Sequence, residues 1–83
     1  MTIPELSAVV LRSGRVENVQ RFAADESWQP TAGLEGVVVH AYPNGSVYVV
    51  EIPEPAGYDK RGGPPLALLD VREEELEVTW TPH

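Results

Sequence analysis

The chain contains no cysteine, so neither a disulfide nor a thiolate metal site can contribute to its fold or its chemistry. It has only two histidines, which leaves little material for acid–base catalysis near neutral pH. No apolar run approaches the length of a membrane span, and the start, Met-Thr-Ile-Pro-Glu-Leu, lacks the basic and apolar segments of a signal peptide. These absences favour a cytoplasmic protein that does not enter a membrane.

Basic residues are also scarce. Six lysines and arginines stand against thirteen acidic residues, which gives a formal net charge of −7. Nucleic-acid binding depends largely on cationic side chains that displace counterions from phosphates, so the composition argues against it. A basic protein partner fits this charge better, because opposite charges speed encounter. The alternative is that the acidity only keeps the protein in solution.

The 83 residues predict a single domain, 1–83, because chains of this length rarely build more than one core. Two long connections interrupt the regular segments: a loop at 13–34 and a Pro- and Gly-rich loop at 53–65. Within the first, Val16, Val19 and Phe22 recur at helical spacing, which predicts a short helical turn in 18–25. The β-branched runs predict five strands, at 7–12, 37–42, 47–52, 66–71 and 77–80, with a 3₁₀ turn at 72–76.

The pair Asn44-Gly45, flanked by strand formers, is a strong hairpin signal. A two-residue loop there fixes a register in which opposed residues share a face. One face is the expected interior and carries Val37, Val39, Ala41, Tyr48, Val50 and Ile52. The other carries Val38, His40, Tyr42, Val47, Val49 and Glu51. A one-residue bulge in the hairpin would change this assignment beyond the bulge.

The second of these faces is too apolar to be an ordinary solvent face. Either the loop at 13–34 folds across it, bringing Val16, Val19, Phe22 and Trp28, or another molecule covers it. The sequence leaves both possibilities open.

The predicted elements follow the order of an SH3-like barrel: a strand, a long loop, a tight hairpin, a loop, a strand, a 3₁₀ turn and a last strand. Four segments, 34–39, 48–52, 67–71 and Glu75-Leu76, resemble the short bacterial SH3-like proteins of a family of unknown function. The resemblance covers residues 34 to about 78. It implies a small, all-β, antiparallel SH3-like barrel, in some cases encoded beside toxin-like genes, and it implies no activity, so the chain is not expected to be an enzyme.

Candidate catalytic and metal sites are weak. The sequence contains no Gly-x-Ser-x-Gly motif, and the acidic run Glu73, Glu74 and Glu75 lacks the pattern of a calcium loop. We therefore expect no cofactor and no metal. The aromatic residues are better candidates for binding, although Trp28 is expected to pin the long loop and Trp80 to pack the barrel seam. The candidate partner-binding residues are Val38, His40, Tyr42, Val47, Val49, Trp28, Tyr58, Glu73, Glu74 and Glu75.

The resulting hypothesis is a non-enzymatic protein-binding module. In its most specific form it is an antitoxin or immunity-type protein that neutralises a basic toxin such as a nuclease. An accessory or self-associating barrel, including a homodimer, is the alternative. A nucleic-acid-binding KOW-like barrel is disfavoured by the charge.

Overall fold

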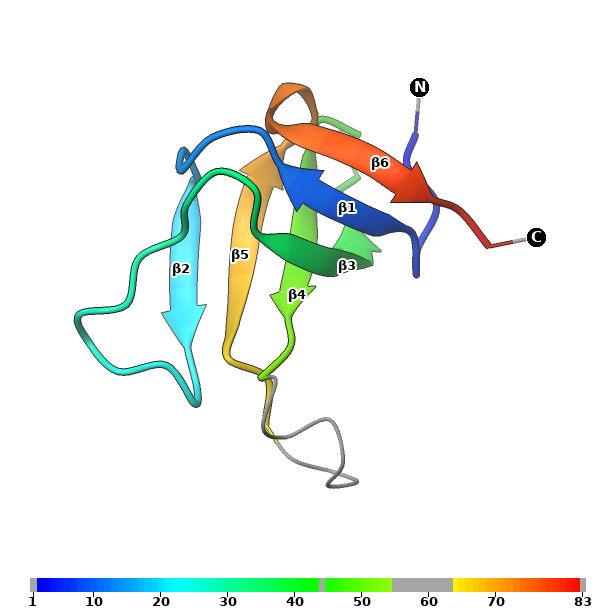
Figure 1. Cartoon of the computed structure of the whole chain (residues 1–83). Helices are drawn as coiled ribbons and strands as arrows, with labels where there is room; N and C mark the ends of the chain where they lie inside the picture. Colours follow the sequence, from blue (N-terminus) through cyan, green and yellow to red (C-terminus); the bar gives the residue numbers. More distant parts are fainter. Residues whose placement is uncertain (1, 44, 55–63, 83) are drawn as a thin grey trace.

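A single antiparallel sheet, sharply bent, forms the regular part of the molecule (Figure 1). The computed structural model describes residues 2–43, 45–54 and 64–82. The strands are β1 (Ala8–Leu11), β2 (Asn18–Arg21), β3 (Glu35–Ala41), β4 (Val47–Ile52), β5 (Ala67–Arg72) and β6 (Leu76–Trp80), and the 3₁₀ helix η2 (Glu73–Glu75) precedes β6. The predictions of an all-β antiparallel fold and of a 3₁₀ turn before the last strand are confirmed.

The order of the strands in the sheet is β2-β5-β4-β3-β1-β6. In Figure 1, β2, β5 and β4 run upright and β3, β1 and β6 cross them at a steep angle. The predictions of five strands and of a closed barrel are wrong. Among the described residues the sheet has six strands and remains open, with β2 and β6 as its two edges.

The core lies between the two halves of the bent sheet. Alternate residues of β4 and β5 are buried, as the period of a half-buried strand requires. Tyr48, Val50 and Ile52 of β4 face inward, as predicted. They pack in one cluster with residues from the other strands and the N-terminal segment, namely Ile3, Val9, Leu11, Val38, Ala67, Leu69, Val71 and Leu76.

A β-bulge in β3 overturns part of the predicted register. Ala41 pairs with Tyr48 and His40 with Val49, as expected, but the pairing then shifts and Val38 lies opposite Val50. Since the bulge adds one residue to β3, every side chain before it changes face. Val38 is therefore fully buried, whereas Val37 and Val39 are partly exposed. Assigning Val38 to the outer side and Val37 and Val39 to the interior was wrong.

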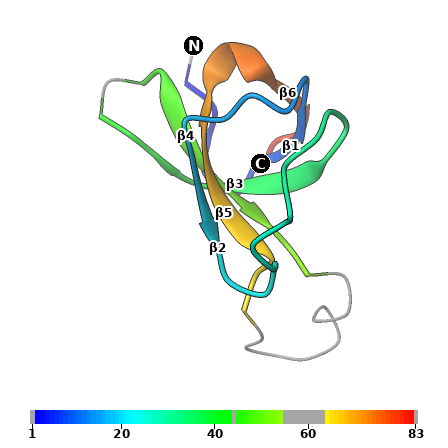
Figure 2. The same cartoon turned by 90° about the vertical axis from the view of Figure 1, so that its left-hand side faces the viewer.

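The loop predicted at 13–34 contains a strand, β2, where a helical turn was expected. β2 pairs with β5 over its whole length, with Val19 opposite Leu69. Figure 2 shows the chain running on from β2 through residues 22–34 to reach β3. Val16, Val19, Trp28 and Leu34 pack against the core cluster. The segment 13–34 thus adds an edge strand to the sheet and covers part of the core.

Candidate protein-binding face

The side of β2, β5, β4 and the end of β3 that points away from the core forms one continuous surface, here called the outer face. Its composition follows from the strand registers, because opposed residues share a face. One row runs from Asn18 through Asp70 and Val49 to His40. The neighbouring rows add Gln20, Val37, Tyr42, Val47, Glu51, Leu68 and Arg72.

Apolar groups on this face remain accessible. Tyr42 is 38% exposed, and Val47, Val49 and Leu68 are partly exposed. Of the two covers left open by the sequence, the internal one does not form among the described residues, because the segment 13–34 contributes an edge strand and packs Val16, Val19 and Trp28 against the core. Phe22, offered as part of that cover, is itself 45% exposed.

Tyr42 and Asp70 are linked across the outer face. The Tyr42 hydroxyl donates a hydrogen bond to Asp70 Oδ2 over 3.1 Å. This bond, which the neutral phenol donates to the carboxylate, raises the pKa of Tyr42 above its usual value. Both residues border an open hollow of about 550 Å³, together with Glu17, Pro43 and Val47.

The His40 ring contacts the Tyr42 ring. The two ring centroids are 5.8 Å apart with an interplanar angle of 77°, which is an edge-to-face contact. The two residues project on the same side because they are two positions apart on β3 and its continuation. His40 is thus an exposed residue of the outer face, as the sequence predicted.

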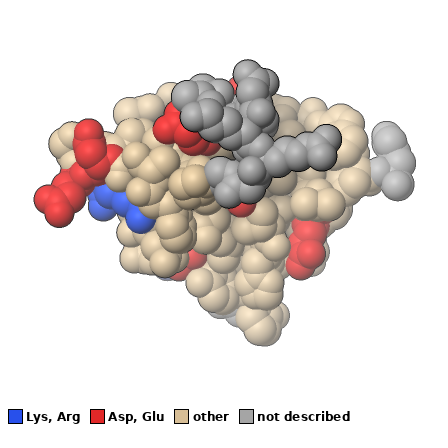
Figure 3. Space-filling model, turned by 90° about the horizontal axis from the view of Figure 1, so that it is seen from below, with Lys and Arg blue, Asp and Glu red and all other residues tan. Residues whose placement is uncertain are grey.

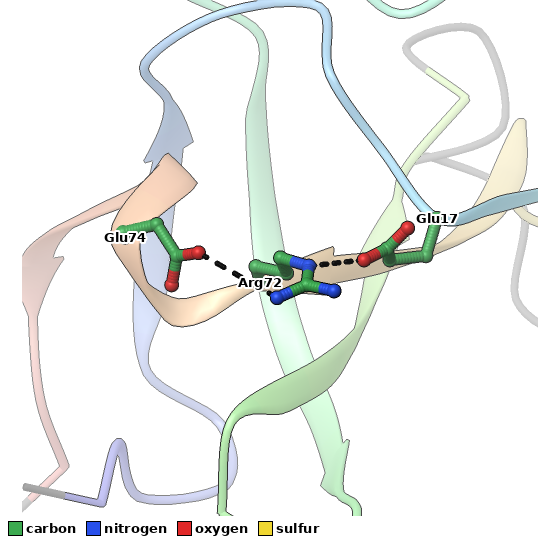
Figure 4. A network of polar contacts seen from close by, with 3 residues as sticks. All are labelled: Glu17, Arg72 and Glu74. Carbon is green, nitrogen blue, oxygen red and sulfur yellow. Dashed lines mark hydrogen bonds and ion pairs between the residues drawn. The ribbon is translucent and has the colours of Figure 1, made fainter.

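Arg72 is the centre of a small ionic network with Glu17 and Glu74 (Figure 4), and Glu17 also borders the hollow. Arg72 Nε donates to Glu17 Oε1, and Arg72 Nη1 lies 4.0 Å from Glu74 Oε1. These partners raise the pKa of Arg72, with the hydrogen bond to Glu17 as the main cause. More than half of the Arg72 side chain is exposed, so the network contributes little to stability. A second, polar hollow of about 800 Å³ also borders Glu17, Arg72 and Glu74.

The three acidic residues Glu73, Glu74 and Glu75, which the sequence offered for partner binding, differ in their contacts. Glu73 accepts a hydrogen bond from the Tyr48 hydroxyl over 3.0 Å, and Glu75 accepts one from Ser13 Oγ over 2.6 Å. Both side chains therefore hold the fold together, and Glu74 is the exposed member of the three.

The other predicted residues fall into separate places. His40, Tyr42, Val47 and Val49 come together on the outer face, whereas Val38 lies in the core. Trp28 packs against the core, and its carbonyl accepts two hydrogen bonds from Arg21, so it pins the long loop as expected. Tyr58 lies outside the described residues. Trp80 does not fill a seam, since it is 54% exposed on β6.

Sequence reasoning missed three members of the outer face, Leu68, Asp70 and Arg72, and it missed Glu17 at the border of the hollow. The alternation of Leu68, Asp70 and Arg72 with the buried Ala67, Leu69 and Val71 carried a usable signal. Glu17 had none, because its position depends on the pairing of β2 with β5, which is fixed by contacts distant in sequence.

The described residues contain no group of three or more His, Asp or Glu side chains placed to hold a metal ion. Nor does the described part of the chain include a helix long and apolar enough to cross a membrane. Comparisons with protein family models, with curated proteins and with solved structures found no match.

Proposed function

We propose that this chain is a non-enzymatic module that binds a basic protein through its outer face. The observation that carries the proposal is the accessible apolar and aromatic surface formed by Tyr42, Val47, Val49 and Leu68, which no described segment covers. Contiguous surfaces of this kind usually mark interaction sites. Aromatic residues supply much of the binding energy in such sites.

The charge of the chain favours a basic partner. The net charge is −7, and the outer face itself carries Glu51 and Asp70. In the view of Figure 3, acidic side chains appear at several places on the lower end of the molecule, and the basic atoms visible there form one small area beside an acidic side chain. Complementary charge would accelerate association and make it sensitive to salt.

Two finer statements belong to this proposal. We infer that the fold is an open relative of the SH3-like barrel, because the long first connection, the β3–β4 hairpin and the 3₁₀ helix before β6 occur in that order. In its most specific form the function is that of a cytoplasmic antitoxin or immunity protein for a basic toxin. The small size, the acidity and the sequence resemblance support that form.

The test is the substitution Val49→Lys, which places a cation in the middle of the outer face. A partner captured from native lysate and then purified should bind this variant at least tenfold more weakly than the parent chain by calorimetry. Its affinity for the parent chain should also fall as salt concentration rises. Val78→Lys is the matched control, because it makes the same change on β6, where Val78 is 40% exposed.

Two results would contradict the proposed function. One is that no stable partner is recovered at micromolar concentration. The other is a partner whose affinity falls with Val78→Lys and not with Val49→Lys, which would move binding to the edge of the sheet.

A second candidate function, self-association, is favoured by the exposed side chains of β6. Val78 and Trp80, which is 54% exposed, lie on an edge strand, and such edges can pair with another chain. Two features make the pairing of this edge with another chain less favourable. Arg12 Nε donates to the Leu76 carbonyl, and the pairing of β1 with β6 shifts between Ala8 and Val9.

We therefore expect the isolated chain to be a monomer in light scattering at concentrations up to about 100 μM, where weak contacts of Kd above 1 mM stay dissociated. A stable dimer that Trp80→Ser converts to monomer would favour self-association instead. Phe22→Ser is the matched control, because it removes another exposed aromatic side chain that does not lie on β6. Trp28 is unsuitable for this purpose because it packs against the core.

A further inference from the structure

Three kinds of side chain line the hollow beside Tyr42. Tyr42 supplies an exposed aromatic ring, Pro43 and Val47 supply apolar surface, and Asp70 and Glu17 supply carboxylates. An aromatic ring next to a carboxylate is a suitable environment for a cation with an apolar stem, because the ring face attracts the charge and the carboxylate pairs with it.

The two carboxylates differ in their availability. Glu17 is engaged by Arg72, which neutralises it. Asp70 Oδ2 accepts a hydrogen bond from the Tyr42 hydroxyl, which holds the carboxylate at the rim of the hollow. No described cationic side chain forms an ion pair with Asp70, and its second oxygen, Oδ1, has no partner among the described residues. Among residues 2–43, 45–54 and 64–82, the hollow therefore keeps one negative charge that no cation pairs.

We propose that this hollow receives an arginine side chain of the partner. The stem would pack on Val47 and Pro43, and the planar guanidinium would stack on Tyr42 and donate to Asp70. Arginine suits these walls better than lysine, because its guanidinium is more weakly hydrated and stacks on aromatic rings. This inference rests on the proposed function and names the chemical group that the outer face recognises.

A second copy of the chain is a poorer occupant. The outer face carries Glu51 and Asp70, and its arginine, Arg72, is already paired with Glu17. Two such faces brought together would place carboxylates near carboxylates, which disfavours association.

The experiment is a titration of the ¹⁵N-labelled full chain with the peptide acetyl-Gly-Arg-Gly-amide, followed by amide chemical shifts. Citrulline has nearly the shape of arginine without its charge, so acetyl-Gly-citrulline-Gly-amide is the matched probe. We expect saturable shifts at Tyr42, Val47 and Asp70 with the arginine peptide, and at least fivefold weaker binding of the citrulline peptide. Val78, on the far edge strand, should not shift.

Asp70→Asn tests the carboxylate itself. The amide retains an oxygen that can accept the Tyr42 hydrogen bond, so the fold should persist while arginine binding falls at least fivefold. Glu51→Gln is the matched control, because it removes one negative charge from the same face outside the hollow. Equal binding of the two peptides, equal losses in both variants, or shifts confined to other residues would overturn the inference.

Failure of this inference can be told apart from failure of the proposed function. A partner protein weakened by Val49→Lys and unaffected by Asp70→Asn would leave the function standing and remove the arginine site. A partner unaffected by Val49→Lys would remove the function, whatever the peptide titration shows.

Discussion

Replacing Gly36 with alanine is expected to lower the free energy of unfolding by about 1–3 kcal/mol, the usual cost of overpacking a filled core. Gly36 is buried in β3, opposite Val9. A Cβ atom added there would lie 2.6 Å from Val50 Cγ1, 2.8 Å from Ile52 Cδ1 and 2.9 Å from the Glu51 carbonyl oxygen. At an unobstructed site the same change would stabilise by about 0.4–1 kcal/mol, because alanine restricts the unfolded chain.

Urea unfolding of the Gly36→Ala and Ile52→Val variants, alone and combined, checks the cause. Ile52→Val removes Cδ1, so the double variant should recover part of the loss. The remaining loss of unfolding free energy should persist, because the Glu51 carbonyl oxygen belongs to the backbone of β4 and cannot rotate away from the added Cβ atom. A Gly36→Ala variant as stable as the parent chain would show that β3 does not approach β4 so closely.

Replacing Tyr48 with phenylalanine should cost about 1–3 kcal/mol, because it leaves a buried backbone N–H without an acceptor. The fully buried Tyr48 presents its hydroxyl to three segments of the chain. The Ile3 N–H donates to it over 3.0 Å, and its own proton is shared between Glu73 Oε1 at 3.0 Å and the Gly45 carbonyl at 3.3 Å. Tyr42→Phe is the matched control, since it removes a hydroxyl whose hydrogen bond is exposed.

The same residue predicts how stability depends on pH. Burial is the main cause that raises the pKa of Tyr48 above its usual value near 10; the hydrogen bond from the Ile3 N–H opposes it, and the hydrogen bond to Glu73 adds to it. The folded state therefore holds the neutral phenol above the pH at which the unfolded chain ionises, and the unfolding free energy falls as pH rises beyond about 10. Urea titrations between pH 8 and 11 should show this slope in the parent chain and a smaller slope in Tyr42→Phe, which keeps Tyr48 and loses Tyr42, whose pKa is also raised. An equally steep slope in Tyr48→Phe would rule out Tyr48 as its source.

The two strands of the central hairpin, β3 and β4, differ in how much of their structure the sequence pattern could predict. β4 was predicted with its observed bounds and its correct inner face, because Tyr48, Val50 and Ile52 alternate with less buried residues. In β3 the three consecutive valines, Val37 to Val39, are equally apolar in either register. The alternation therefore contains no signal for the bulge, which was seen only in the pairing of the strands.

Contacts between distant parts of the chain account for what the sequence could not predict. β2 has a single inward apolar residue, Val19, and becomes a strand because β5 offers it a partner. The hollow at Tyr42 depends on Asp70, which lies 28 residues away in sequence. The sequence thus predicted the hairpin members of the outer face, Tyr42, Val47 and Val49, whereas Leu68, Asp70 and Arg72 joined it through the pairing of β5 with β4.

The pairing of β1 with β6 joins the first and the last strands of the chain, with Ala8 opposite Trp80. Because domains fold during synthesis only as far as their strands have emerged from the ribosome, β1 has no partner on that side until β6 has emerged. Val9 and Leu11, both buried in the finished sheet, remain open on that side until then. The nascent chain therefore exposes part of its core until β6 has emerged from the ribosome.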